Sequence, residues 1–169
     1  MRCLRPPSMI AYKIMKSVLA PVDLSDAAAD VVSEAGALAG NVGGRVLLLH
    51  VVPPTAVTSE YAVESERLAE EETLKAERSL EHWRDSLKNL GMDAEANVLH
   101  GPPVETIVEE AARRNADYIV MGSHGHGALY HLFVGGTAGG VIKRSACPVM
   151  VVPGPGTVAH RSISQRQNA

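Results

Sequence analysis

The sequence predicts an α/β protein built on an open parallel β-sheet with helices on both faces. Five short apolar runs alternate with segments of helical character along the 169 residues. The run VLLLHVV, residues 46–52, is almost unbroken aliphatic, as is typical of a strand buried on both faces. Strands that alternate with helices pair in parallel through right-handed crossovers, so a five-stranded sheet is expected.

The first strand and helix are predicted over residues 18–22 and 26–39. The strand ends at Asp23, and Ser25 is expected to cap the alanine-rich helix that follows. The glycines within residues 40–44 are expected to stop this helix before the second strand, residues 46–52.

A long charged helix is predicted over residues 59–90, with Gly91 as its C-cap. Apolar residues spaced three and four apart are expected to face the core: Leu80, Trp83, Leu87 and Leu90. The charged residues between them then form a solvated outer face.

The rest of the chain supplies three more strands, at residues 94–100, 117–121 and 148–152, and a helix at residues 104–114. Pro102 and Pro103 open that helix, and Ile107, Val108 and Ala111 are expected to face inward. Residues 14–153 are predicted to form one domain, with an N-terminal extension over residues 1–13 and a disordered polar tail over residues 154–169.

Composition excludes several classes of protein. A formal net charge of −3 and 4% aromatic residues argue against a nucleic-acid partner, which usually requires a basic surface and stacking side chains. No apolar run approaches the length of a membrane span. Of the two cysteines, Cys147 precedes the last strand and is expected to be a reduced core residue, which favours a cytoplasmic location. No CxxC pair is present, so a Cys/His metal site is not expected.

Two glycine clusters lie between the fourth and fifth predicted strands, in the stretch GSHGHGALYHLFVGGTAGG. Glycine at the carboxyl end of a parallel strand lets backbone N–H groups approach a phosphate, so a phosphate cradle is the first hypothesis. The spacing fits neither a Walker A loop nor a dinucleotide fingerprint. Ser123 is not a nucleophile elbow, because Met121 stands where that motif has glycine.

The spacing of Gly122, Gly125 and Gly135 resembles the Gly-x2-Gly-x9-Gly pattern of nucleotide-binding universal stress proteins. Three further segments resemble the first, second and last strands of that family: KSVLAPVDLSD, VLLLHVV and CPVMVVP. One position departs from the ATP-binding pattern, since Gly136 stands where that pattern has Ser or Thr, and Thr137 follows it.

The resemblance implies an adenine nucleotide alpha hydrolase-like fold with strand order 3-2-1-4-5, which places Asp23 and Gly122 at the two sides of one crevice. The family's adenosine-side contacts map onto Pro21, Asp23, Val51 and Met121, and its phosphate contacts onto Gly122, His124, Gly125, Gly135 and Gly136. With Gly136 at that position, Thr137 is the hydroxyl expected to donate to phosphate instead, through a slight shift of the glycine-rich turn. The implied ligand is ATP, AMP or ADP, with or without Mg²⁺.

Two functions from different classes remain open. The first is an adenine-nucleotide-binding regulatory module of the stress response. The second is a stress-associated dimeric interaction protein with a vestigial crevice, which Gly136 favours. Catalysis is not expected beyond slow ATP hydrolysis, because Asp23 has no evident catalytic partner. The family resemblance also implies a homodimer paired through the last strand, Val149 to Val152.

The histidines and Asp23 also have simpler interpretations. His124, His126 and His131 do not form a recognisable metal-ligand set, and His124 is expected as a neighbour of phosphate. His50 is expected to be a hydrogen-bonded histidine near the carboxyl end of the sheet. Asp23 is alternatively a helix-start cap with no ligand.

Overall fold

The computed structural model describes residues 15–25, 27–54, 62–123 and 136–154, and the structural statements below refer to these residues. Five parallel strands form one sheet in the order β3-β2-β1-β4-β5. Their bounds are β1 Lys16–Pro21, β2 Gly44–Val52, β3 Ala94–His100, β4 Tyr118–Gly122 and β5 Val149–Val152. The predicted fold class and strand order are confirmed.

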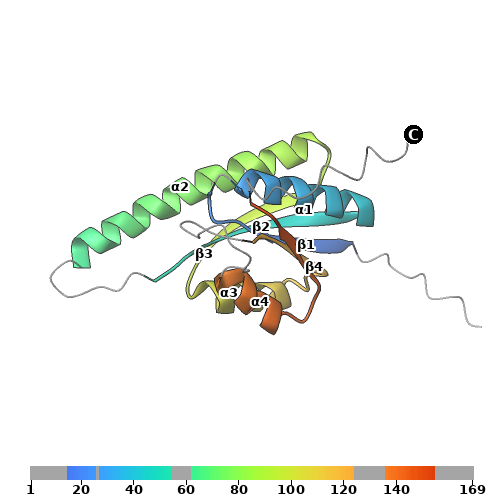
Figure 1. The fold of residues 1–169 in the computed structure, drawn as a ribbon. Helices are drawn as coiled ribbons and strands as arrows, with labels where there is room; N and C mark the ends of the chain where they lie inside the picture. Colours follow the sequence, from blue (N-terminus) through green and yellow to red (C-terminus); the bar gives the residue numbers. More distant parts are fainter. Residues whose placement is uncertain (1–14, 26, 55–61, 124–135, 155–169) are drawn as a thin grey trace, which may run out of the picture.

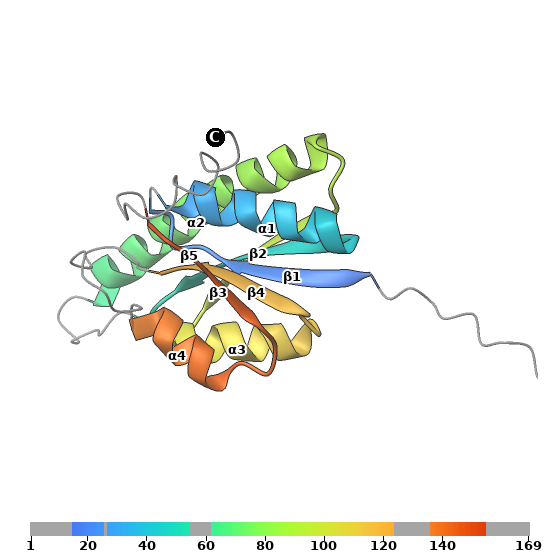
Figure 2. The same cartoon turned by 45° about the vertical axis from the view of Figure 1, so that its right-hand side comes forward.

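In the described parts of the chain, four helices cover the sheet in two layers. They are α1 Ala28–Val42, α2 Ala62–Asn89, α3 Pro103–Arg113 and α4 Gly136–Arg144. Figures 1 and 2 show α1 and α2 on one face of the sheet and α3 and α4 on the other. None of the helices in the described ranges is long and apolar enough to cross a membrane.

The core has two halves because successive side chains of a strand point to opposite faces of the sheet. Val18, Val46, Leu48 and Val120 pack under α1 and α2, whereas Leu19, Leu47, Leu49, Ile119 and Met121 pack under α3 and α4. The middle strands β1, β2 and β4 are therefore apolar at consecutive positions, which is why they were recognisable in the sequence.

The start of α1 differs from the prediction. The helix begins at Ala28, and its N-cap position is Ala27, which makes no side-chain capping bond. Ser25 is wrong as the cap, because its backbone N–H and its hydroxyl both donate to Asp23 Oδ1. The helix also continues to Val42, through Gly40, and ends at Gly43 in the left-handed conformation with φ of 63°.

The apolar stripe of α2 is confirmed at Leu80 and Leu87, which are buried, and Trp83 packs partly buried against the same core. Leu90 is wrong as a core residue, because its side chain is 75% exposed. It follows Asn89, the last helical residue, and the chain turns away at Gly91, where φ is 80°. The helix is described from Ala62, so the predicted start at residue 59 lies outside the described residues.

Gly140 brings α4 close to α3. A Cβ built at Gly140 would lie 2.7 Å from Val104 Cγ2, closer than real side-chain contacts allow. The missing side chain therefore permits the close approach of the two helices. The sequence pattern alone does not predict this packing role, because glycine inside a helix ordinarily costs about 1 kcal/mol relative to alanine.

Candidate functional site

The crevice is expected at the carboxyl ends of the middle strands. β1 is paired with β2 on one side and β4 on the other, so the chain order reverses between β1 and β4. A topological reversal of this kind opens a crevice beyond the strand ends in open α/β sheets. Pro21 is the last residue of β1 and Gly122 is the last residue of β4.

Five of the ten predicted contact residues lie at the ends of these three adjacent strands: Pro21, Asp23, Val51, Met121 and Gly122. Met121 is buried and Val51 packs against the same apolar cluster, which lies under α3 and α4. Both apolar contacts are therefore on the face of the sheet that α3 and α4 cover.

Gly136 and Thr137 are the first two described residues of α4, and both are exposed. The first N–H groups of a helix lack intrahelical partners and carry partial positive charge, so this end of α4 suits an anion. Among the described residues, a Cβ built at Gly136 would meet no atom within 4 Å. The predicted contacts His124, Gly125 and Gly135 lie outside the described residues, as do His126 and His131.

Asp23 forms part of a tight corner after β1. Its Oδ1 accepts hydrogen bonds from the Ser25 N–H at 3.1 Å and from the Ser25 hydroxyl at 2.6 Å. Leu24, between them, has φ of 61°, a left-handed conformation that non-glycine residues rarely adopt. Asp23 therefore stabilises its own turn through these two bonds.

His50 lies in β2 beside this corner. Its Nδ1 is 2.7 Å from the carbonyl oxygen of Val22, so the expected hydrogen bond is present. Its Nε2, however, is buried and has no hydrogen-bond partner within the described parts of the chain. The expectation of a satisfied histidine thus holds for one ring nitrogen.

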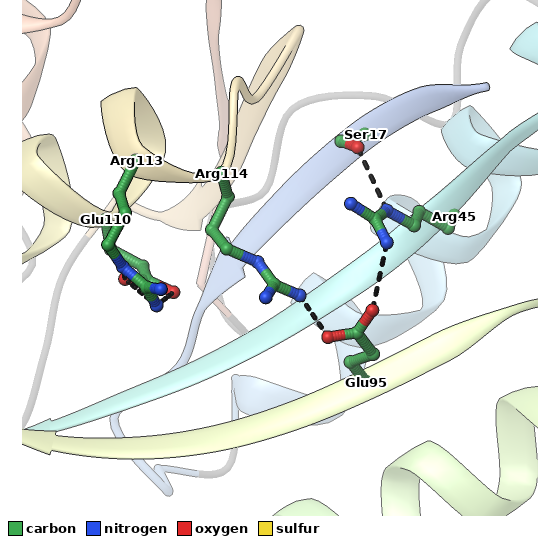
Figure 3. Close-up of polar contacts among 6 residues, drawn as sticks. All are labelled: Ser17, Arg45, Glu95, Glu110, Arg113 and Arg114. Carbon is green, nitrogen blue, oxygen red and sulfur yellow. Dashed lines mark hydrogen bonds and ion pairs between the residues drawn. The ribbon is translucent and has the colours of Figure 1, made fainter. Parts of the chain in front are cut away.

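A charged network joins the strands at their amino ends, opposite the predicted crevice (Figure 3). The sequence analysis did not predict this network. Arg45 of β2 donates from Nε to the Ser17 hydroxyl at 3.1 Å and from Nη1 to Glu95 Oε1 at 3.0 Å. Arg114, just after α3, donates to the other oxygen of Glu95. Ser17, Arg45 and Glu95 lie at the amino ends of β1, β2 and β3, away from the predicted crevice, so we assign the network a structural role.

Lys16 and Asp117 join the amino end of β1 to the segment just before β4. The Lys16 ammonium donates to Asp117 Oδ1 at 2.6 Å, and the Ser17 N–H donates to Asp117 Oδ2 at 2.9 Å. The hydrogen bond from Lys16, followed by that from Ser17, holds the pKa of the Asp117 carboxyl below its ordinary value.

Glu110 on α3 is buried, and Arg113 donates to its two oxygens at 2.8 and 2.7 Å (Figure 3). Pairing of this kind satisfies a carboxylate removed from water. Within the described residues, no three His, Cys, Asp or Glu side chains are grouped as a metal site would require.

Comparison with known proteins identifies the family. The profile of the universal stress protein family matches residues 15–153. The chain belongs to the universal stress protein family. A universal stress protein of Methanocaldococcus jannaschii is 33% identical over 145 residues, 84% of each chain. One from Thermus aquaticus is 34% identical over 140 residues, which cover 82% of this chain and 99% of the relative.

Solved structures of universal stress proteins share the fold. A structure from Methanocaldococcus jannaschii, solved to assign a biochemical function, superposes with a TM-score of 0.74 at 29% identity, covering 84% of this chain and 98% of that one. A universal stress protein in complex with cAMP gives 0.62 at 23% identity, covering 81% and 96%. The Archaeoglobus fulgidus protein in complex with dAMP gives 0.57 at 24% identity, with the same coverage. The last two likenesses concern the fold alone.

Proposed function

We propose that this universal stress protein is a regulatory module that binds an adenine nucleotide, ATP, AMP or ADP, in the crevice between β1 and β4. The observation that carries the proposal is the gathering of Pro21, Asp23, Val51, Met121 and Gly122 at three adjacent strand ends. The complexes of two family members with cAMP and dAMP support the choice of an adenine nucleotide.

Each part of the crevice suits one part of the ligand. Val51, which is partly buried, offers apolar surface to the adenine ring, and the buried Met121 belongs to the apolar cluster against which Val51 packs. The Asp23 carboxylate accepts hydrogen bonds from ribose hydroxyls. Gly122 has no Cβ to obstruct the phosphates, and the N–H groups at the start of α4 donate to them. With ATP, Mg²⁺ arrives bound to the phosphates.

The proposed role is binding and not catalysis. ATP hydrolysis needs metal ligands and a group that positions water, and Asp23 is the carboxylate at the proposed site among the described residues. We therefore propose at most slow hydrolysis, and a cytoplasmic location in keeping with the reduced Cys147.

We also propose a homodimer paired through β5. β5 is the edge strand next to β4, and Met150 on it is 41% exposed. A hollow of about 270 Å³ runs along this edge between α1 and β5, lined by Asp30, Ser33, Glu34 and residues 150–153. An apolar strand edge is a liability unless a partner covers it, and a second copy of β5 would do so.

Calorimetric titration of ligand-stripped protein with AMP, and with ATP in the presence and absence of Mg²⁺, tests the nucleotide site. Asp23→Asn keeps an oxygen for the Ser25 bonds but removes the charge, and we expect it to weaken binding roughly tenfold. Asp93→Asn, just before the amino end of β3 and far from the predicted site, is the matched control and should bind the nucleotide as tightly as the wild type does. No binding to the wild-type protein would favour the dimeric interaction protein with a vestigial crevice.

A further inference from the structure

His50 is a buried polar side chain that the proposed nucleotide contacts leave unexplained. It is 6% exposed, and Nε2 finds no hydrogen-bond partner among the described residues. Burying a polar nitrogen without a partner costs free energy, and an apolar side chain of similar size would avoid this cost. The other ring nitrogen, Nδ1, must therefore supply the reason for a histidine here.

Nδ1 holds the backbone where β1 ends. A carbonyl oxygen can only accept, so the contact of 2.7 Å to Val22 requires the proton on Nδ1. The last paired position of β1 with β2 is Pro21 with Leu49. One residue later, the Val22 N–H donates to the Leu49 carbonyl at 2.8 Å. Both polar groups of the Val22 backbone are thus bonded to β2, one of them through the His50 side chain.

The bonds of Val22 precede the strained part of the corner. Asp23 follows Val22 directly, and Leu24 then adopts the left-handed conformation with φ of 61°. Beyond Leu24, the two bonds from Ser25 to Asp23 Oδ1 close the turn. A backbone conformation of this kind persists where its surroundings hold it on both sides.

We infer that His50 is a positioning residue for Asp23. By donating from Nδ1 to the Val22 carbonyl, it fixes the direction in which the chain leaves β1 and so the place of the Asp23 carboxylate at the crevice. The effect of His50 on ligand binding rests on the nucleotide site proposed above, whereas its effect on the corner does not.

Two substitutions separate this role from simple core filling. His50→Leu fills the space and removes the donor. His50→Asn places an amide nitrogen at the same number of bonds from Cβ as Nδ1, so it can restore the bond to Val22. Amide hydrogen exchange reports the corner through the Ser25 N–H, which donates to Asp23 Oδ1. The Asp117 N–H donates to the Ser17 carbonyl at the amino end of β1, so its exchange rate measures opening of the sheet away from the corner.

We expect His50→Leu to speed exchange at Ser25 roughly tenfold without a matching change at Asp117, and His50→Asn to return Ser25 to within about threefold of the wild type. Nitrogen-15 spectra of the wild type should show the proton on Nδ1. An equal rise at Ser25 and Asp117, no rescue by His50→Asn, or a proton on Nε2 would overturn the inference.

AMP titration of the same variants then tests the consequence for the ligand. Binding should weaken roughly tenfold in His50→Leu and recover in His50→Asn. If the wild-type protein binds no AMP, the proposed nucleotide site fails, and hydrogen exchange still decides whether His50 holds the corner. If AMP binds and His50→Leu binds it equally well, the positioning role is wrong.

Discussion

Gly136 is the residue at which this chain departs from the ATP-binding pattern, and its surroundings allow the departure to be reversed. A Cβ at this first described position of α4 would meet no atom within 4 Å in the described parts of the chain. We expect Gly136→Ser to tighten ATP binding roughly tenfold, because a hydroxyl bonded to a charged phosphate contributes about 1.5–3 kcal/mol. Titration calorimetry with ATP measures the change.

Gly136→Ala is the matched control for that experiment. It adds the same Cβ and the same restriction of the unfolded chain as serine, but it adds no hydroxyl. Equal affinities of the serine and alanine variants would show that the hydroxyl makes no bond to phosphate at this position.

We expect Asp117 to make a contribution to the free energy of unfolding that is lost in acid. Its folded-state pKa lies below the ordinary value of about 3.9, so the stabilisation is present above that pH and is lost as pH falls through the folded-state pKa. We expect Asp117→Asn to lower the free energy of unfolding by about 1–2 kcal/mol at pH 7 and to flatten its fall below about pH 4. Urea unfolding at pH 7 and at pH 3 measures both effects. Asp93→Asn, exposed at the same edge, should leave the difference between the two pH values unchanged.

At the scale of elements, two helical glycines make opposite predictions. Gly140→Ala places a Cβ against Val104, and we expect it to destabilise the protein by about 1–3 kcal/mol through overpacking between α3 and α4. Gly40→Ala, in the exposed part of α1 with no atom within 4 Å, should instead stabilise by about 0.5–1 kcal/mol. Thermal unfolding of the two variants measures both, and a shift of the same sign in each would contradict the packing role of Gly140.

The strands could be predicted because a strand buried on both faces has apolar residues at consecutive positions. β3 runs over residues 94–100 as expected, and β2 begins only two residues before its predicted start. Helix ends were less predictable, because several local signals compete there. Serine is a residue type that often caps helices, yet Ser25 donates its hydroxyl hydrogen bond to Asp23. Leu90 continues the apolar spacing of α2 but lies after the last helical residue, Asn89.

The place of the candidate site could be predicted in part. In open α/β sheets ligands bind where the strand order reverses, and both this rule and the glycine spacing point to the carboxyl ends of β1 and β4. The network of Arg45, Glu95 and Arg114 was not predictable, because Arg45 and Glu95 are 50 residues apart and meet through the pairing of β2 with β3, and Arg114, 19 residues after Glu95, comes from the end of α3. The bond from His50 to Val22 likewise spans 28 residues. Such pairs follow from the assembled sheet and leave no periodic pattern in the chain.

For the molecule as a whole, the proposed dimer depends on the free edge of β5. We expect Met150→Lys to convert a dimer to a monomer, because it places a charge on the strand edge that the second copy would cover. Leu90→Lys removes a more exposed apolar side chain at the end of α2 and should leave the dimer intact. Analytical ultracentrifugation at micromolar concentration distinguishes these outcomes, and a monomeric wild type would remove the proposal.

The central place of β1 in the sheet has a consequence for the order in which the newly made chain folds. β2 follows β1 after one helix, but Lys16 and Asp117, which join β1 to the segment before β4, are 101 residues apart. A ribosome that adds roughly 5–20 residues per second therefore leaves one edge of β1 unpaired for about 5–20 s. We expect nascent chains stalled before β4 to be cut by protease within β1, and chains in which β4 and β5 have left the ribosome to resist. Each newly made molecule thus passes through seconds in which an apolar strand edge is open to other chains.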